Sequence, residues 1–281
     1  MPTTYLFVPG SRPDRFQKAW DTPAHVVILD LEDAVAPVDK AAARASVGTF
    51  LQSIPLSAQT RVMVRINDVR SPWFAEDLRW LESLPWLGVM LPKAESTADF
   101  DALRDAGSER ELIALIETVR GVCQAKEVAQ AGGVTRLAFG SLDYGFDLGV
   151  DGPGLALDLA GLELALASRL AELPPPIAGV TQSLEAHAVE QDVWHAKSLG
   201  FGGKLCIHPA QLAPVVQAFS PDAQTRAWAE RVVSAWRDAE RDAERNAGPS
   251  GAGVGALMVD GKMVDKPVLL RAQRVLGLSN S

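Results

Sequence analysis

Two short apolar segments of the chain each lead to a single carboxylate. One runs through Leu-Ile to Glu117, and the other runs through Phe-Gly-Ser-Leu to Asp143. Neighbouring parallel strands lie about 4.8 Å apart, so acids that leave the ends of two such strands can converge on one point. Mg²⁺ prefers oxygen ligands and accepts one or two protein carboxylates, with water and substrate in its other positions. The pair therefore predicts a magnesium site. The alternative is two solvated acids, or ion-pair partners of Arg120 and Arg136.

Arg65 ends the apolar segment Val-Met-Val-Arg-Ile-Asn. A guanidinium at the end of a buried strand needs an anion, and its planar fork matches a carboxylate. We therefore predict that Arg65 binds a substrate carboxylate. The alternative is a salt bridge to Asp30, Glu32 or Asp33, which follow another apolar segment and orient Arg65 or metal-bound waters. Lys93, in Leu-Pro-Lys, is either a second anion-binding group or a salt-bridge partner.

Other metal and thiol chemistries have little support in the sequence. The four histidines form neither an HExxH motif nor a cluster, so no zinc site is expected. Cys123 and Cys206 fit a reduced, cytoplasmic protein without a disulfide framework. Cys206 lies within Leu-Cys-Ile, which favours a small buried apolar side chain.

Composition excludes several classes of function. The chain has 281 residues, 47% of them apolar and 22% charged, which is typical of a globular protein with a substantial core. With 27 Lys and Arg against 35 Asp and Glu the net charge is −8 and no basic stripe is present, so nucleic acid is not an expected partner. No apolar run reaches about 18 residues, and the opening residues lack the pattern of a secretory signal, so we expect neither a membrane span nor export.

These groups must be positioned by a regular framework, and the chain alternates strand-like and helix-like segments. The apolar runs are 5–9, 26–31, 61–67, 88–92, 111–117, 136–140, 177–181 and 203–207. The stretches with helical periodicity include 38–51, 74–84, 97–106, 119–131, 155–170 and 184–199. Uniformly apolar runs are typical of buried parallel strands. Eight such repeats predict an α/β fold, a (β/α)8 TIM barrel; a doubly wound sheet is the alternative, but its glycine-rich first turn is missing.

The barrel also predicts where the chemistry lies, because active sites of this fold form at the carboxyl ends of the strands. The polar residues that follow the predicted strands are Asp30, Glu32, Asp33, Arg65, Asn67, Lys93, Glu117, Asp143 and His208. A random distribution of charge would not favour that end of the barrel.

The last part of the chain has a different composition. A solvated helix is predicted over 221–246, with one apolar stripe of Trp228, Val232 and Trp236. The glycine-rich segment 248–255 is typical of a flexible linker. The following residues are too apolar for a disordered tail. We therefore predict a catalytic barrel over 1–220 and a helical extension over 221–281, which packs on the barrel or on a neighbouring subunit.

Taken in order, the motifs resemble those of the citrate lyase β-subunit-like family of metal-dependent C–C lyases, which includes malyl-CoA and citramalyl-CoA lyases. The matching motifs span most of the chain: Phe7-Val-Pro-Gly-Ser-Arg-Pro, Ile28-Leu-Asp-Leu-Glu-Asp-Ala-Val, Val64-Arg-Ile-Asn, Leu91-Pro-Lys, Ile116-Glu-Thr, Phe139-Gly-Ser-Leu-Asp, Gly203-Lys-Leu-Cys-Ile-His-Pro-Ala-Gln and Met263-Val-Asp-Lys-Pro. The resemblance implies a Mg²⁺-dependent enzyme that cleaves or forms a 3-hydroxyacyl thioester, with an acyl-CoA and a 2-keto acid as the other partners.

The resemblance also implies roles for individual residues. Glu117 and Asp143 would hold Mg²⁺, and Arg65 would bind the keto-acid carboxylate with help from the amides that follow Gly140. Asp265, which barrel topology alone does not place, would act at the thioester α-carbon in the site of a neighbouring subunit, because such proteins are commonly homotrimers or multiples of them. The sequence departs from the family pattern at residues 174–187, where relatives usually carry acidic residues. The resemblance therefore does not define which acyl group is bound.

Two further arginines, Arg12 and Arg15, lie beside the end of the first predicted strand and are candidate contacts for CoA phosphates. Other functions could use the same metal site. A thioesterase or malate synthase would release free acid, a citrate lyase β subunit would act on an acyl carrier protein, and an aldolase of sugar-derived keto acids would need no thioester. A non-catalytic barrel is disfavoured because the predicted metal ligands and Arg65 are all present.

Overall fold

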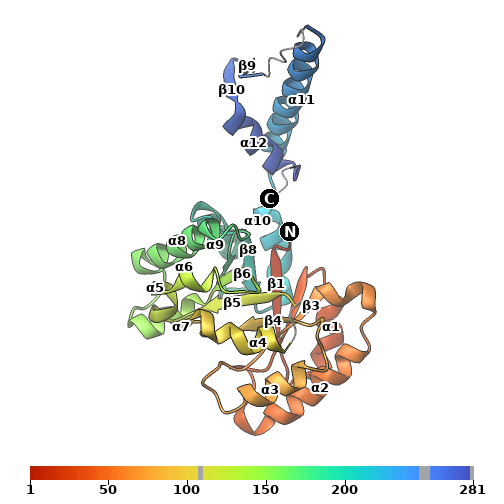
Figure 1. Cartoon of the computed structure of the whole chain (residues 1–281), viewed down its shortest axis with the longest axis vertical. Coiled ribbons are helices and arrows are strands. Elements are labelled where there is room, and N and C mark those ends of the chain that lie inside the picture. Colours follow the sequence, from red (N-terminus) through yellow and green to blue (C-terminus); the bar gives the residue numbers. More distant parts are fainter. Residues whose placement is uncertain (107–109, 247–253, 279–281) are drawn as a thin grey trace. The chain divides into compact units, whose positions relative to one another are not determined.

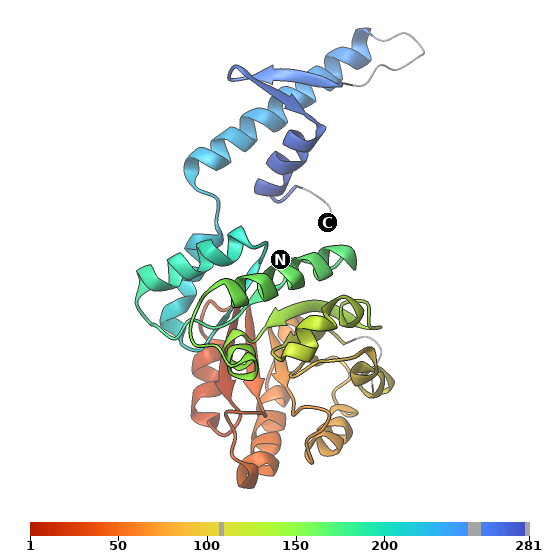
Figure 2. The same ribbon diagram turned by 90° about the vertical axis from the view of Figure 1, so that its left-hand side faces the viewer.

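The computed structural model describes residues 1–106, 110–246 and 254–278, and it divides into two compact units (Figures 1 and 2). The first unit is Met1–Phe219 and the second is Ser220–Ser281. Most of the predicted linker, residues 248–253, lies outside the described residues. Among the described helices, none combines the length and the apolar composition that a membrane crossing requires.

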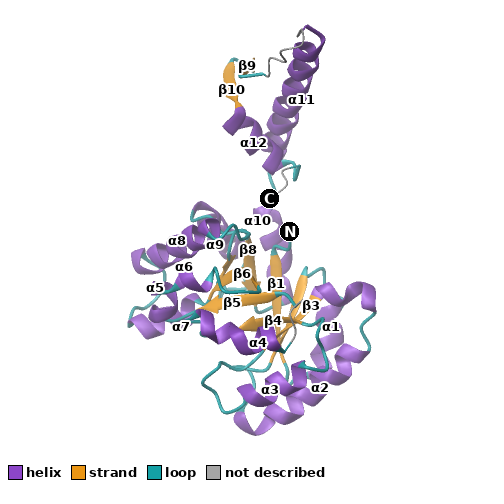
Figure 3. Ribbon diagram, viewed as in Figure 1, coloured by secondary structure: helices purple, strands orange, loops and turns teal. Residues whose placement is uncertain are grey.

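The first unit is a closed barrel of eight parallel strands in sequence order, so the predicted TIM barrel is confirmed. Figure 3 shows the strands gathered at the centre of the unit with helices around them. The strands are β1 (Thr4–Pro9), β2 (Val26–Asp30), β3 (Val62–Arg65), β4 (Gly88–Leu91), β5 (Leu112–Ile116), β6 (Val134–Phe139), β7 (Ile177–Ala178) and β8 (Gly203–Cys206).

Helices cover the outside of the barrel. They are α1 (Phe16–Trp20), α2 (Lys40–Gln52), α3 (Phe74–Leu81), α4 (Asp101–Asp105), α5 (Val119–Cys123), α6 (Ala125–Val128), α7 (Ser141–Leu148), α8 (Leu155–Leu170), α9 (Ala186–Ser198) and α10 (Leu212–Phe219). Short 3₁₀ turns occupy Pro13–Arg15, Pro37–Asp39, Leu56–Arg61, Thr97–Phe100 and Pro209–Gln211. The predicted helix 119–131 is divided in two at Gln124, whose backbone leaves the helical region.

The strands have two apolar faces, and each face builds a separate core. Side chains such as Ile28, Met63 and Ile113 point inward and fill the barrel. The alternate positions, such as Leu29 and Val64, point outward and pack under the helices. This alternation explains the uniformly apolar runs, because a parallel strand in a barrel is buried on both faces.

A buried ion pair fastens two of the helices to the end of β3. The guanidinium of Arg44 on α2 lies 2.8 Å from the carboxylate of Asp77 on α3, which is fully buried. The other oxygen of Asp77 accepts hydrogen bonds from the backbone and side-chain amides of Asn67, at 2.9 and 2.7 Å. The group therefore holds the β3 end in place, next to Arg65.

Replacement of Arg44 by methionine is expected to reduce the free energy of unfolding by about 3–5 kcal/mol, because the Asp77 carboxylate would stay buried without its cation. Urea denaturation measures this change. The matched control is Arg104→Met, since Arg104 pairs with Asp101 at 2.9 Å on the surface. That variant should lose less than about 1 kcal/mol. Equal losses in the two variants would contradict the structural role given to Asp77.

The second unit has its own small core. It contains α11 (Ala223–Asn246), the antiparallel strands β9 (Ala256–Val259) and β10 (Lys262–Asp265), and α12 (Lys266–Val275). The strands are joined at Asp260 and Gly261, both with positive φ (51° and 72°), as in the turns favoured by two-residue hairpins. Val232 and Trp236 of the predicted stripe on α11 are buried against the hairpin and α12. The packing of this unit on a barrel stays a prediction.

Candidate active site

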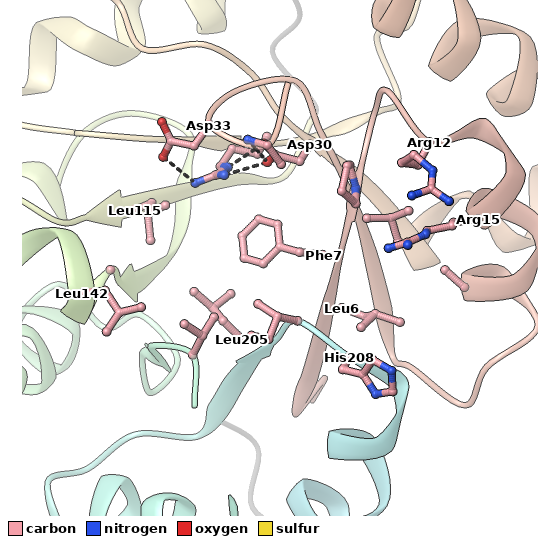
Figure 4. A pocket seen from close by; sticks show the side chains of 18 of the residues that line it. Leu6, Phe7, Arg12, Arg15, Asp30, Asp33, Leu115, Leu142, Leu205 and His208 are labelled. Atoms are coloured by element: carbon pink, nitrogen blue, oxygen red, sulfur yellow. Dashed lines mark hydrogen bonds and ion pairs between the residues drawn. The ribbon is translucent and has the colours of Figure 1, made fainter. Parts of the chain in front are cut away.

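A cavity of about 720 Å³ opens at the mouth of the barrel, lined by residues at or just beyond the carboxyl ends of seven strands. Its wall is partly apolar: Leu6, Phe7, Leu115, Leu142 and Leu205 surround the space drawn in Figure 4. The polar groups lie at its edges. This is the end of the barrel at which the strand topology predicts an active site.

Glu117, which follows β5 directly, is the most deeply buried acid of this cavity. Its side chain is only 1% exposed, and it accepts a hydrogen bond from the backbone N–H of Lys93 at 3.0 Å. Burial, with a further contribution from the charges of Glu32 and Asp143, raises the pKa of Glu117 to about 8. A buried acid with so little neutralisation is suited to a bound cation.

Asp143 lines the same cavity and follows the sixth strand, as the sequence predicted. It is the third residue of α7, which begins at Ser141, two residues after the end of β6. Gly140 joins the two elements. A Cβ at this position would lie 2.4 Å from the Cβ of Glu117, so only glycine allows this close approach. The absence of a side chain there lets the two carboxylates share one edge of the cavity.

Arg65, at the end of β3, forms a two-bond contact with Asp30, with both nitrogen–oxygen distances at 2.7 Å. Its third nitrogen lies 2.9 Å from Glu32 and 3.7 Å from Asp33. The guanidinium also lies over the ring of Phe7, 4.9 Å from its centroid. Burial opposes the positive charge, but Asp30 and Glu32 outweigh it, and the pKa of Arg65 is raised.

Arg65 is therefore salt-bridged and still lines the cavity. A guanidinium has five N–H donors; the hydrogen bonds to Asp30 engage two of them, and Glu32 lies at ion-pair distance from the third nitrogen. The two roles that the sequence left as alternatives are compatible, because the acids fix the orientation of the side chain while donors remain for a ligand. Two of the acids that contact Arg65, Asp30 and Asp33, are labelled in Figure 4.

Lys93 forms a salt bridge in the structure, which is one of its two predicted roles. Its ammonium contacts Glu32, and Asp33 lies 3.9 Å away. Its backbone has φ of +49°, an uncommon conformation for a residue other than glycine, and this directs its N–H to Glu117. Lys93 and Glu32 thus lie behind the groups that line the cavity, and their predicted contact with substrate stays a prediction.

The other ion-pair partners considered for the two acids are engaged elsewhere. Arg136 donates to the carbonyl of Pro2 and to the hydroxyl of Tyr5, both at 2.9 Å, at the opposite end of the strands. Arg120 is exposed, 3.8 Å from Glu95. Glu117 and Asp143 therefore do not owe their positions to those arginines.

A group of basic side chains follows β1, the strand that pairs with β2 and Asp30. Arg12, Arg15 and Lys18 line the cavity beside the end of β1, and Arg12 pairs with Asp14 at 2.9 Å. Figure 4 places Arg12 and Arg15 near His208, whose Nδ1 accepts a hydrogen bond from the backbone of the following turn. Lys18 was not predicted, although it continues the spacing of Arg12 and Arg15.

The described residues contain no cluster of three or more His, Cys, Asp or Glu side chains arranged for a metal. A cation here would use the two carboxylates, with water and substrate completing its shell, which is the usual mode for Mg²⁺. The buried Glu117 carboxylate and the space that Gly140 leaves beside it both fit such an ion.

A family model for HpcH/HpaI aldolase/citrate lyase matches residues 3–209, which include the whole barrel through β8. The chain belongs to this family. The matched residues include the cavity-lining Arg65, Glu117 and Asp143.

Named relatives of this HpcH/HpaI-family chain cover nearly all of it. A citrate lyase subunit beta-like protein of Mycobacterium tuberculosis is 36% identical over 280 residues, which is 97% of this chain and 93% of the relative. A (3S)-malyl-CoA thioesterase of Cereibacter sphaeroides is 30% identical over 273 residues, 96% of this chain and 92% of the relative. The alignments therefore extend into the second unit.

Solved structures of the family show the same architecture. CitE of M. tuberculosis in complex with magnesium, acetoacetate and coenzyme A has a TM-score of 0.80 and 32% identity, with 99% of this chain and 97% of that chain covered. A citrate lyase beta subunit of M. tuberculosis complexed with oxaloacetate and magnesium has a TM-score of 0.69 and 34% identity, covering 78% and 97%.

The remaining predicted site residue, Asp265, lies in the second unit. Its side chain accepts a hydrogen bond from the backbone N–H of Val268 at 3.2 Å and so caps α12. The capping role explains its local conformation. Its predicted part in the chemistry is not tested by this contact and stays a prediction.

Proposed function

We propose that this chain is a Mg²⁺-dependent carbon–carbon lyase that cleaves, or in reverse forms, a 3-hydroxyacyl thioester such as malyl-CoA or citramalyl-CoA. The products of cleavage are an acyl-CoA and a 2-keto acid. The observation that carries the proposal is the shared cavity, which is lined by Glu117, Asp143 and Arg65 and also by the basic side chains that follow β1.

Glu117 and Asp143 would hold the ion. When bound, Mg²⁺ supplies positive charge that polarises the substrate oxygens and stabilises the negative charge that develops on them. The relatives complexed with magnesium support this choice of ion. Burial, followed by the charge of Glu32, raises the pKa of Glu117 and so disfavours an ionised carboxylate there unless a cation is bound.

Arg65 would anchor the carboxylate of the keto-acid half. Arg65 lines the cavity, and its contacts with Asp30 and Glu32 restrict its motion, so little binding energy is lost in ordering the side chain. The backbone amides at the start of α7, after Gly140, would bind the same carboxylate, because the first amides of a helix lack partners within it.

The bond changes can then be assigned. The substrate hydroxyl loses its proton, its oxygen forms the carbonyl of the keto acid, and the bond between the two carbons breaks. The electron pair of that bond passes into the thioester as an enolate, which takes up a proton at its α-carbon. Asp265 of a neighbouring copy is our candidate for the proton donor.

A role for Asp265 in another copy requires an oligomer, and we infer a homotrimer or a multiple of one. Arg12 and Arg15, which line the cavity after β1, would contact the phosphates of CoA, and Lys18 adds a third cation there. The relative complexed with coenzyme A supports a CoA thioester over a carrier-bound one. The cytoplasmic location and the absence of a nucleic-acid partner stay predictions from composition.

The decisive assay incubates the purified protein and Mg²⁺ with malyl-CoA, citramalyl-CoA and β-methylmalyl-CoA, and follows keto acid and thioester together. Lyase activity releases one keto acid for each acyl-CoA. Hydrolysis is the second candidate, since relatives named (3S)-malyl-CoA thioesterase align over almost the whole chain, and it would release free CoA without a keto acid. Activity only with a carrier-protein thioester would favour a citrate lyase β subunit.

The raised pKa of Glu117 makes cation binding depend on pH. Between its ordinary value of 4.5 and about 8 the folded protein holds a proton that Mg²⁺ must displace. We expect the affinity for Mg²⁺ to rise about tenfold per pH unit between pH 6 and 7 and to level off above about pH 8. Calorimetric titrations in buffers of different ionisation enthalpy measure both the affinity and the proton released.

The proton on Glu117 also makes the free energy of unfolding depend on pH. Between pH 4.5 and about 8, Glu117 is protonated in the folded state but ionised in the unfolded state. The cation-free protein therefore becomes less stable as the pH rises through this range. Saturating Mg²⁺ should remove this slope. An affinity that does not change between pH 6 and 8 would show that Glu117 is ionised without the ion and would contradict the description of the site.

A further inference from the structure

Lys40, the first residue of α2, has its ammonium group buried behind the loop that follows β2. The residue is only 5% exposed. Its Nζ donates to the backbone carbonyls of Leu31 and Glu32, at 2.7 and 2.8 Å. The ammonium also lies over the ring of Trp73, 5.1 Å from its centroid. No step of the proposed reaction uses this charge.

A buried ammonium without a carboxylate in contact is unusual. Among the described residues, the hydrogen-bond acceptors of Lys40 are carbonyls, and no carboxylate lies within ion-pair distance of it. Burial lowers the pKa of Lys40, and the more distant charges of Asp30 and Glu32 oppose that shift. Burial of a charge costs free energy, and an apolar side chain would pack as well at the start of α2. The charge therefore calls for a reason other than the stability of this helix.

Both residues that accept hydrogen bonds from Lys40 are also bound to Arg65. The backbone N–H of Leu31 donates to the carbonyl of Arg65 at 2.8 Å. The carboxylate of Glu32 lies 2.9 Å from the guanidinium of Arg65. Lys40 is therefore connected to Arg65 by two routes, one through the backbone and one through a side chain, although it is not among the residues that line the cavity.

The loop between Lys40 and Arg65 has polar groups on two sides. On one side, its carbonyls accept from Lys40. On the other side, the backbone amides of Glu32 and Ala34 donate to the carboxylate of Asp30, at 2.9 and 3.2 Å. Asp30 in turn accepts two hydrogen bonds from Arg65, both of 2.7 Å. Lys40 thus holds the back of a loop whose front orients the arginine.

The charges around the loop are balanced only when Lys40 is counted. The three acids of the loop are Asp30, Glu32 and Asp33. In the part of the chain that the structure describes, the cations in ion-pair contact with them are Arg65 and Lys93. Without Lys40, one negative charge would be uncompensated beside the guanidinium, and the site would attract a substrate carboxylate less strongly.

We propose that Lys40 is a positioning residue for the keto-acid site. From behind the loop it fixes the orientation of Arg65, and it supplies the positive charge that leaves this arginine available to a substrate carboxylate. The inference rests on the proposed function, because it takes Arg65 as the group that binds the keto acid. It goes beyond that function because Lys40 acts without contact with the substrate or the ion.

Binding of pyruvate and of glyoxylate at saturating Mg²⁺ tests the proposal. Lys40→Met keeps most of the side-chain volume but removes the charge and both hydrogen bonds. We expect the dissociation constant of the keto acid that binds to rise by at least about tenfold, because Arg65 would lose its alignment with the carboxylate. The affinity for Mg²⁺ alone should change much less, since neither Glu117 nor Asp143 lies on the loop. Titration calorimetry measures both affinities.

The matched control is Lys197 on α9, whose Nζ also donates to a backbone carbonyl, that of Ala218 at 2.6 Å. Lys197→Met should leave both affinities unchanged. An unchanged keto-acid affinity in Lys40→Met would overturn the proposal. Equal losses of Mg²⁺ and keto-acid affinity would also overturn it, because they indicate general damage. If circular dichroism shows that Lys40→Met does not fold, Lys40→Gln takes its place, since its amide can still donate to a carbonyl.

Hydrogen exchange separates a failure of this proposal from a failure of the proposed function. In the ligand-free protein, peptides that cover residues 28–36 should exchange faster in Lys40→Met than in Lys197→Met, because the loop would open more often. Equal exchange would show that Lys40 does not hold the loop and would overturn the proposal. If the original chain bound neither keto acid, the role of Arg65 in the proposed function would be contradicted. Normal binding and normal exchange in Lys40→Met would contradict only the role of Lys40.

Discussion

Replacement of Glu117 by glutamine is expected to lower lyase turnover by a factor of about a thousand or more and to abolish measurable Mg²⁺ binding. The amide keeps the volume of the side chain but removes one of the two charges proposed to hold the ion. A metal that stabilises developing charge contributes several kcal/mol to the transition state, which corresponds to this factor. The two readouts are steady-state rates at saturating Mg²⁺ and titration calorimetry.

The matched control lies at the other end of the same strand. Glu111 precedes β5 directly, as Glu117 follows it, so Glu111→Gln removes an equal charge away from the cavity. This variant should retain the activity of the original chain. Glu117→Gln should also be at least as stable as the original near pH 8 without Mg²⁺, because it removes a buried acid whose ionisation is unfavourable. Near-normal turnover in Glu117→Gln would reject the metal site.

Much of the barrel could be predicted because its determinants are local. Eight apolar runs specify strands that are buried on both faces, and the residue after each run then falls at the mouth of the barrel. Arg65 and Glu117 were found in this way, from their position directly at a strand end. Asp143 follows the sixth run as predicted, but helix α7, on which it lies, was not among the predicted helical segments, because only Gly140 separates α7 from β6.

The pairing of the charged groups could not be predicted in the same way. The sequence presents Asp30, Glu32 and Asp33 as equivalent acids, but the structure distinguishes them by geometry: Asp30 binds Arg65 through two contacts, and Asp33 is only at its edge. The positive φ of Lys93 has no sequence signal, although it directs the N–H that orients Glu117. Such contacts depend on the register between strands.

The shortness of β7 is a third difference with a physical reason. The apolar run 177–181 predicted a longer strand, yet pairing extends only over Ile177–Ala178. The next residue, Gly179, lies so close to Ser141 that a Cβ there would be 2.4 Å from its hydroxyl oxygen. The chain therefore leaves the sheet at this glycine to pass the start of α7, which is a contact between distant segments.

The second large effect is expected at Arg65. Arg65→Lys keeps the positive charge but cannot donate two parallel hydrogen bonds both to Asp30 and to a substrate carboxylate. Loss of a charge-assisted bond of this kind corresponds to about 2–3 kcal/mol, so kcat/KM should fall by a factor of about a hundred. Because Arg65 binds the keto-acid half, the loss should appear in the condensation direction mainly as a higher KM for the keto acid.

The control for Arg65 is the arginine at the opposite end of β3. Arg61 precedes this strand and donates to the backbone carbonyls of Trp20, Thr22 and Ala24, far from the cavity mouth. Arg61→Lys should lower stability slightly and leave the KM for the keto acid unchanged. If the Arg65→Lys variant were only less stable and still bound the keto acid normally, the role of Arg65 would be structural and limited to its contacts with Asp30 and Glu32. The carboxylate would then have to be bound by the amides after Gly140 alone.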